Sequence, residues 1–379
     1  MSNLLSKASI VLTPTAYSDG DLHCIKPNTA TGDFDFTRST TATRINSSGN
    51  VESVAANLPR IDYTGGTGQI LLEPQTTNLL TYSEDFSQWS AGSTITLQSG
   101  FSAPDGTNNA YKLTKTGTAQ PYLIFNASLT TSSTRSIFAK TVSGTGTVNL
   151  LNHNSNTNNL FTLTENWQRF DVSTSNSTGV ANFYAVDFRG SSSLSEIIVF
   201  GANATNDQAF ATSYIQTSGS TSTRNADLWN NAGSSSLISS TEGGLYAEIA
   251  SLTNTDATRF IALSNGTTSN RVYIGVSSTT HAISSNLRFN GSTQFAATEI
   301  VSDTTTYHKI AVKYKSNDIA LWINGVEVAT DTSSTMPTAL DSLQFTSGAS
   351  GAIFNGNVKC VAVYKEALTD AELTCLTTI

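Results

Sequence analysis

Aromatic and amide side chains in the middle of the sequence have the types that bind a sugar. Such binding needs an aromatic ring against the apolar face of the pyranose, with amides and carboxylates around it for the hydroxyls. The aromatic candidates are Tyr122, Phe125, Tyr184 and Phe188, and the polar candidates near them are Asn126, Asn152, Asn154 and Asp187. Tyr122 and Tyr184 are the best candidates for a ligand-facing platform, because most other aromatic residues in β-strands belong to a core.

Residues for general catalysis do not converge in a recognisable motif. The histidines stand apart from one another, at His23, His153, His281 and His308. No two of them have the spacing of a zinc-binding helix, so each is expected to be a strand or surface residue. The sequence also lacks the G-x-S-x-G turn of serine hydrolases and a phosphate-binding loop.

Glycoside hydrolysis needs only two carboxylates facing across a cleft. The candidates in the C-terminal part are Glu248, Glu299, Glu327 and Asp331. They do not form the close E-x-D-x-x-E cluster of a catalytic strand. We therefore expect no enzymatic activity.

Length and composition limit the number of domains and the kinds of partner that are expected. The 379 residues exceed one ordinary core, so two or three domains are expected. Charged residues make up 13% of the chain and the net charge is −8, which argues against nucleic acid and against an anionic membrane surface. No run approaches the roughly 20 apolar residues of a membrane span, and the first residues do not have the pattern of a signal peptide.

The three cysteines cannot all pair with one another. They are Cys24, Cys360 and Cys375, and none lies in a C-x-x-C arrangement. We expect three free thiols, with a Cys360–Cys375 bridge as the alternative.

Short strand-like runs follow one another through the first 227 residues. Residues 42–54 and 59–74 predict two β-hairpins, which hold too little apolar surface to fold alone. Eight further strands are predicted at 110–113, 122–125, 135–140, 147–151, 160–163, 168–172, 183–188 and 196–200. Residues 210–215, F-A-T-S-Y-I, predict one more strand, which would close the sandwich. Strands at this spacing without a helical period predict a β-sandwich or barrel.

A second sandwich is predicted after a polar linker. Residues 307–314 and 319–328 alternate as a hairpin, and Asn324-Gly325 marks a further tight turn inside the second run. The tail reads as a strand, a turn and a short helix that begins with a capping box of Thr369 and Glu372.

Two sets of runs resemble known families. F-T-R-S-T-T-A-T-R-I-N, P-R-I-D-Y-T-G-G-T-G-Q-I-L-L-E-P-Q-T-T-N-L-L and F-A-T-S-Y-I-Q-T-S-G-S-T-S-T-R-N-A-D resemble a module of bacteriophage virion proteins. There it accompanies a jelly roll similar to carbohydrate-binding modules. W-I-N-G-V and the C-terminal tail resemble the concanavalin A-like, laminin-G-type lectin sandwich.

The resemblances imply an all-β chain with tandem antiparallel sandwiches and one short C-terminal helix. The N-terminal β-rich region, for docking or oligomerisation, would span residues 1–80, and the jelly roll 81–227. A linker at 228–242 would lead to the concanavalin-like domain at 243–379. Both folds commonly hold a structural calcium ion, for which Asp105 and Asp227 are the candidate oxygen donors.

The resemblances also imply a role. They favour a non-catalytic protein of the virion surface, a tail or head fibre or appendage that adheres to glycans. Its partners would be other virion proteins of the capsid, tail or portal, and it would form a homotrimer. One alternative is a capsid or tail decoration (cement) protein without a glycan ligand, and another is a polysaccharide depolymerase.

Overall fold

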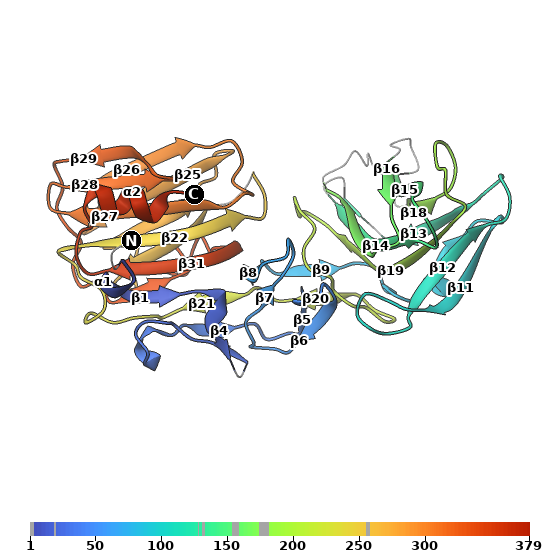
Figure 1. Cartoon of the computed structure of the whole chain (residues 1–379), viewed down its shortest axis with the longest axis horizontal. Helices are drawn as coiled ribbons and strands as arrows, with labels where there is room; N and C mark the ends of the chain where they lie inside the picture. Colours follow the sequence, from blue (N-terminus) through green and yellow to red (C-terminus); the bar gives the residue numbers. More distant parts are fainter. Residues whose placement is uncertain are drawn as a thin grey trace. The chain divides into compact units, whose positions relative to one another are not determined.

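Antiparallel strands make up most of the chain, which confirms the predicted all-β class. The computed structural model describes residues 4–18, 20–127, 129–130, 133–153, 159–173, 182–254 and 258–379 (Figure 1). Contacts divide the chain into two compact units. Unit 1 comprises Met1–Ser39, Ala56–Pro74 and Ala226–Ile379, and unit 2 comprises Thr40–Ala55 and Gln75–Asn225.

Unit 2 is a sandwich of two five-stranded sheets. One has the order β11 (Ile95–Phe101), β12 (Ala110–Lys115), β19 (Glu196–Thr205), β14 (Thr134–Thr141) and β17 (Gln168–Val172). The other has the order β10 (Ser90–Ala91), β13 (Tyr122–Asn126), β18 (Asn182–Asp187), β15 (Gly146–His153) and β16 (Leu160–Leu163). Side chains of both sheets, such as Val199 and Leu123, meet in one apolar core. The eight strands predicted for the jelly roll are all present, as β12 to β19.

Two small ladders complete unit 2. They are the predicted hairpin of β5 (Ala42–Ile45) with β6 (Val51–Val54), and the pair of β9 (Thr76–Asn78) with β20 (Ser222–Arg224). The closing strand predicted at residues 210–215 does not form. Side chains satisfy its backbone instead, because Thr43 Oγ1 donates to the Tyr214 carbonyl at 2.6 Å and Asn78 Nδ2 donates to the Ile215 carbonyl at 2.8 Å.

Unit 1 is a larger sandwich. Its eight-stranded sheet contains β29 (Val326–Asp331), β28 (Ile319–Ile323), β27 (His308–Lys315), β22 (Glu242–Ser251), β31 (Gly356–Tyr364), β8 (Gln69–Leu72) and β7 (Ile61–Asp62), with β1 (Ala8–Leu12) also paired to β31. Its five-stranded sheet has the order β26 (Ser292–Ile300), β25 (Ala282–Phe289), β24 (Arg271–Val276), β23 (Arg259–Ser264) and β30 (Ser342–Gln344). The apolar core between them includes Leu245, Ile274 and Val361.

Unit 1 also takes up segments that the sequence suggests are separate. Strands β1, β7 and β8 come from residues 1–80, which the structure divides between the two units. The predicted linker, 228–242, contributes β21 (Leu228–Asn230), which pairs with β4 (Asp35–Thr37), and the buried side chain of Trp229. The remaining pair is β2 (Tyr17–Ser18) with β3 (Asp21–Leu22), and 3₁₀ turns occur at Pro14–Ala16, Ala30–Gly32 and Phe86–Gln88.

Two short helices lie at the ends of the described chain. The first is α1 (Leu4–Lys7), and the second is α2 (Asp370–Thr377), which lies over β27 and β28 (Figure 1). The capping box predicted for α2 is confirmed, because Thr369 accepts from the Glu372 amide and Glu372 accepts from the Thr369 amide. Leu373 of α2 packs with Trp322 on the outer face of the eight-stranded sheet. None of the helices in the described ranges is long and apolar enough to cross a lipid bilayer.

All three cysteines are free thiols, so the alternative Cys360–Cys375 bridge is not formed. Burial raises the pKa of Cys24 and of Cys360 to about 12, with smaller contributions from Asp33 and Glu248 respectively. Cys375 is exposed.

Because the thiolate is the nucleophile, we expect iodoacetamide at pH 8 to alkylate Cys375 alone in the folded protein. Peptide mass spectrometry measures the modification, and denatured protein, in which all three thiols react, is the control. Alkylation of Cys24 at the same rate as Cys375 would contradict the structure.

Candidate functional site

The outward face of the β10–β13–β18–β15–β16 sheet gathers most of the candidate sugar-binding residues. Leu123, Val148 and Phe183 point into the core, so the alternate positions on these strands face away from it. Two cross-strand rows result: Tyr122, Asp187 and Asn149 form one, and Ile124, Tyr184 and Asn152 form the other. We call Tyr122, Tyr184, Asp187, Arg189 and Asn149 the Tyr122–Tyr184 site.

An arginine organises the aromatic part of this site. The rings of Tyr122 and Tyr184 meet edge to face, with centroids 4.9 Å apart and planes at 76°. The Arg189 guanidinium lies 4.7 Å from the Tyr122 ring centroid and 4.8 Å from that of Tyr184. The two rings therefore form a corner around a cation and not one flat platform.

The cation is fixed by a carboxylate. Arg189 donates to Asp187 through Nε at 2.9 Å and through Nη2 at 2.6 Å, in a two-pronged geometry. These hydrogen bonds with Asp187 raise the pKa of Arg189 above its ordinary value, despite partial burial. The side chain of Arg189 is 41% exposed whereas that of Asp187 is 8% exposed. The guanidinium is thus held in place with part of its surface open to a ligand.

Asn149 adds a hydrogen-bond acceptor beside this pair. Its Nδ2 donates to the Arg189 carbonyl and to Ser192 Oγ, both at 2.9 Å. Its Oδ1 is buried and has no partner among the described residues. A buried acceptor without a donor is unfavourable, so a sugar hydroxyl or a water molecule that donates there would be stabilised.

The structure separates the predicted residues into two groups. Tyr122, Tyr184 and Asp187 come together, with Asn152 in the next cross-strand position. Phe125 is 0% exposed and Phe188 is 1% exposed, because both rings fill the core; the prediction is wrong for these two. Asn126 lies at the end of β13, and Asn154 lies outside the described residues.

Sequence reasoning missed Arg189 and Asn149. Arg189 follows Asp187 by two positions, in the turn D-F-R-G after β18. An acidic residue and a basic residue at this spacing, next to the predicted tyrosine, were the signal that could have identified the pair.

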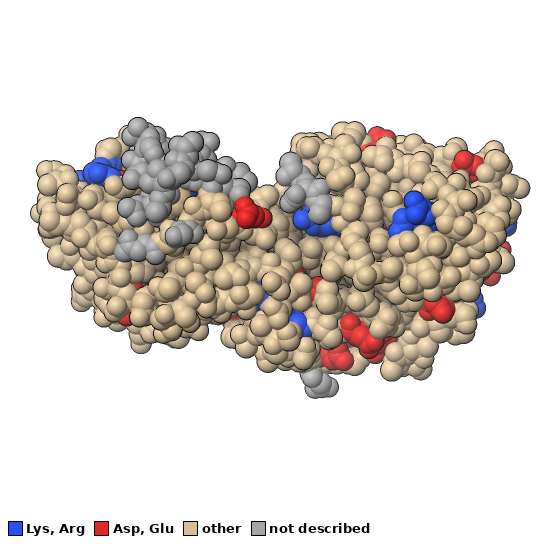
Figure 2. All heavy atoms as spheres, turned by 180° about the vertical axis from the view of Figure 1, so that it is seen from behind, with Lys and Arg blue, Asp and Glu red and all other residues tan. Residues whose placement is uncertain are grey.

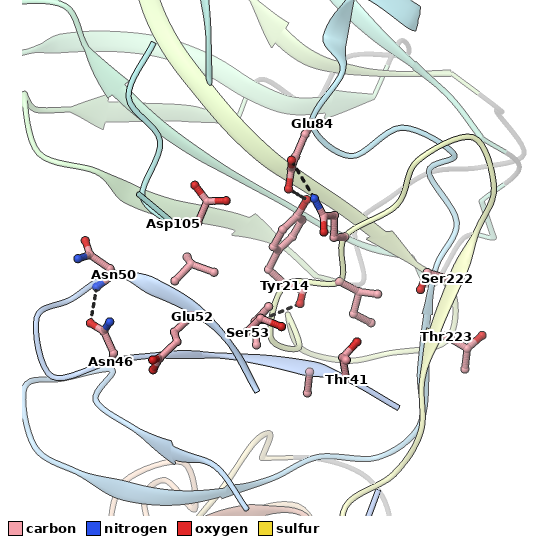
Figure 3. Close-up of a pocket in the computed structure, with 15 residues that line it drawn as sticks. Thr41, Asn46, Asn50, Glu52, Ser53, Glu84, Asp105, Tyr214, Ser222 and Thr223 are labelled. Carbon is pink, nitrogen blue, oxygen red and sulfur yellow. Dashed lines mark hydrogen bonds between the residues drawn. The ribbon is translucent and has the colours of Figure 1, made fainter. Parts of the chain in front are cut away.

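Unit 2 also contains a polar cavity of about 510 Å³ (Figure 3). Its lining is uncharged or acidic: Thr41, Ala42, Thr43, Asn46, Asn50, Val51, Glu52, Ser53, Glu84, Asp105, Tyr214, Ile215, Gln216, Ser222 and Thr223. Glu84 and Asp105 lie on one side, and the β5–β6 hairpin provides the other (Figure 3).

Each carboxylate in the cavity is engaged by its own neighbours. Glu84 accepts from the Tyr214 hydroxyl at 2.8 Å, and Glu52 accepts from Arg44 Nε at 2.8 Å. Asp105 caps its own turn, accepting from the Thr107 amide at 3.0 Å and the Thr107 hydroxyl at 2.7 Å. These bonds hold the cavity wall together, and they do not arrange two carboxyl groups about a shared reaction centre.

The two candidate calcium ligands lie in different units and in different environments. Asp105 belongs to the turn just described, whereas the side chain of Asp227 is 0% exposed and pairs with Arg38 Nη1 at 2.9 Å. Asp227 also bonds Arg60, whose Nη1 donates to Glu73 at 2.7 Å. Asp227 is therefore part of a buried ion network, which contradicts its prediction as a metal ligand. Within the described ranges, no three His, Cys, Asp or Glu side chains come close enough to hold a metal ion.

Comparison with known proteins identifies one part of the chain. Residues 234–374 match the family model of the concanavalin A-like lectin/glucanases superfamily, of the laminin-G type. No curated protein matches the chain in sequence.

Solved structures show a low similarity to parts of this chain. The CBM40 module of the Ruminococcus gnavus IT-sialidase, bound to α2,3-sialyllactose, is 17% identical with a TM-score of 0.34, over 38% of this chain and 86% of that one. Domain 4 of an extracellular arabinanase from Geobacillus stearothermophilus is 16% identical with a TM-score of 0.30, over 45% of this chain and 84% of that one. At these TM-scores neither structure supports a conclusion about this chain. The family match therefore makes residues 234–374, which lie in unit 1, similar to the concanavalin A-like lectins.

Proposed function

We propose that this chain is a non-catalytic glycan-binding protein and that its sugar site in unit 2 is the Tyr122–Tyr184 site. The observation that carries the proposal is the grouping of two part-exposed tyrosines, a fixed guanidinium and an unpartnered amide oxygen on one sheet face. Rings bind the apolar face of a sugar, while the guanidinium donates to hydroxyl oxygens and the amide oxygen accepts from a hydroxyl. The lectin fold of residues 234–374 supports the same role.

We further propose that the chain acts on the surface of a bacteriophage particle, as a fibre or appendage of the head or tail. The support is the resemblance of the runs at residues 36–46, 59–80 and 210–227 to a virion module. In this setting it would assemble as a homotrimer with other virion proteins and attach the particle to host glycans. Antibodies against the chain should decorate intact particles under the electron microscope, and labelling of neither head nor tail would refute the location.

The absence of catalysis is part of the proposal. It is supported by the separate hydrogen-bond partners of the three carboxylates that line the cavity. Incubation with the polysaccharides that the protein binds should release no reducing ends. Release of oligosaccharides would establish a depolymerase instead.

Replacing either tyrosine should weaken glycan binding. On a glycan array, followed by calorimetry with the best ligand, Tyr122→Ala and Tyr184→Ala should each reduce affinity by about tenfold or more, because a ring at the centre of a binding site contributes about 1–2 kcal/mol. Tyr82→Ala is the matched control, since Tyr82 lies in unit 2 but in neither five-stranded sheet. If no glycan binds and particles lacking the chain lose stability, the protein is a cement protein.

A further inference from the structure

A second polar patch lies in the lectin domain, on the outer side of its five-stranded sheet, where most of the side chains are buried or half-buried. Ile261, Val272 and Leu287 point into the core of unit 1, so the residues next to them on β23, β24 and β25 face outward. The strand register arranges the outward residues in three rows: Thr293, Arg288, Arg271, Ser264 and Ser342; Ala296, Asn286, Tyr273, Ala262 and Gln344; and Thr298, Ser284, Gly275 and Phe260. These rows contain two arginines and no acidic residue. We call them the Arg271–Arg288 face.

The two arginines stand directly opposite each other on adjacent strands. Like charges in this position are unfavourable unless an anion lies between them. Neither forms an ion pair with a described residue, and the Nε atoms of both are buried without a hydrogen-bond partner in the described part of the chain. Arg271 is 8% exposed, and its Nη1 donates to the Ser347 carbonyl at 2.6 Å.

The electrostatics of the pair agree with this geometry. Burial lowers the pKa of Arg271, and the charge of Arg288 lowers it further, whereas Tyr273 opposes the change. Arg271 therefore lies in a site where an added negative charge would be favourable. In Figure 2, the basic side chains on the visible face stand singly in a largely uncharged surface.

An aromatic surface and an acceptor complete the face. The Tyr273 ring stacks on the Phe260 ring at a centroid distance of 3.9 Å and an interplanar angle of 18°, and the Arg271 guanidinium lies 4.9 Å from the Tyr273 centroid. Asn286, opposite Tyr273 in the register, donates through Nδ2 to the Phe295 carbonyl at 2.9 Å. Its Oδ1 has no partner among the described residues, although Asn286 is only 6% exposed.

We propose that the Arg271–Arg288 face binds a sugar that carries a carboxylate, such as a uronic acid. The carboxylate lies between the two guanidiniums, a sugar hydroxyl donates to Asn286 Oδ1, and the ring packs against Tyr273. This site is separate from the Tyr122–Tyr184 site and belongs to the other unit. Two adjacent cations that lack acidic partners among the described residues indicate an anionic ligand, and the planar guanidinium matches the geometry of a carboxylate.

The test uses the full chain and calorimetry with three oligosaccharides: alginate, dextran sulfate and neutral dextran. We expect alginate to bind, and its affinity to fall as salt is added. At equal charge, alginate should bind more tightly than dextran sulfate. Neutral dextran should not bind at this face. Arg288→Gln should weaken alginate binding by about thirtyfold or more, since the loss of one partner of a buried charge pair has at least this effect. The same variant should melt at the same or a higher temperature, because it removes the repulsion between the arginines.

Lys365→Gln is the matched control. It removes one positive charge from an exposed position of the same unit, outside the three rows, and should leave alginate binding unchanged. Failure of alginate to bind, or unchanged affinity of Arg288→Gln, would overturn the proposal. Binding of dextran sulfate as tight as that of alginate would overturn the assignment to a carboxylate. Tyr122→Ala reports on the other site, so the two proposals fail independently.

Discussion

Substitution of Arg60 by methionine is expected to lower the free energy of unfolding of unit 1 by about 3–5 kcal/mol, because it removes one cation from a buried ion network. Arg60 is 1% exposed and donates to Glu73 through Nη1 at 2.7 Å. It also bonds Asp227, which accepts from Arg38 at 2.9 Å and from the Glu73 amide at 2.8 Å. Arg38 still bonds Asp227 in the variant, whereas the hydrogen bonds from Arg60 to Glu73 and to Asp227 are lost.

The measurement is chemical denaturation combined with hydrogen exchange, which reports on unit 1 separately from unit 2. The double variant Arg60→Met/Glu73→Gln should recover part of the loss, since it also removes one negative charge from the buried network. Lys7→Met is the control within the same unit, because Lys7 pairs with Glu372 at the surface and exposed pairs contribute about 0–1 kcal/mol. Equal effects of Arg60→Met and Lys7→Met would show that the buried network is not a major source of stability.

Substitution of Tyr214 by alanine is expected to lower the stability of unit 2 by about 3–5 kcal/mol, as for other buried aromatic residues. Tyr214 is 4% exposed, and its ring centroid lies 5.7 Å from that of Phe200 and 6.3 Å from that of Phe138. Its hydroxyl bonds Ser83 Oγ at 2.6 Å and Glu84 at 2.8 Å. The ring therefore fixes an irregular segment against a sheet that it does not join by backbone pairing.

Tyr214→Phe separates the two contributions. It keeps the ring, so the loss should be about 1–3 kcal/mol, the cost of unsatisfied buried partners. Burial raises the pKa of Tyr214 well above its ordinary value, with Glu84 adding to the effect. In the unfolded chain a tyrosine has a pKa of about 10. Because the pKa of Tyr214 is higher in the folded protein, the folded state is fully stable below pH 10 and loses stability as the pH rises above it. Denaturation midpoints between pH 9 and 11 should thus fall less for Tyr214→Phe than for the unmodified protein. A smaller loss for Tyr214→Ala than for Tyr214→Phe would contradict this account.

Local signals in the sequence were sufficient for most of the secondary structure. The turn at Asn324-Gly325 has φ angles of 50° and 87°, which asparagine and glycine tolerate, and the hairpin around it forms as predicted. The capping box at Thr369 depends on residues three positions apart. These features involve neighbours in the chain, so propensity and spacing identify them.

Pairings between distant segments could not be predicted in the same way. Asp227 is separated by 189 residues from Arg38 and by 167 from Arg60. The sequence alone offers Asp227 only as one of two carboxylates for the calcium ion that the resemblances imply. The same limit applies to the Tyr122–Tyr184 site: strand alternation predicts that Tyr122 and Phe125 face opposite ways, but the register that brings Asn149 beside Asp187 is a property of the folded sheet.

The position of β31 in the eight-stranded sheet sets the order in which the chain can fold as it is synthesised. Strand β31 pairs with β22, with β8 and with β1, and it follows all other strands of the described residues. Both segments of unit 2 end by Asn225, so the ribosome completes that unit first. The N-terminal strands must wait for their partner, and at about 5–20 residues per second the delay is roughly tens of seconds. Over this interval β1 and the edge of β8 that does not pair with β7 lack their partner β31 in the nascent chain, and we expect them to be the segments on which a chaperone acts.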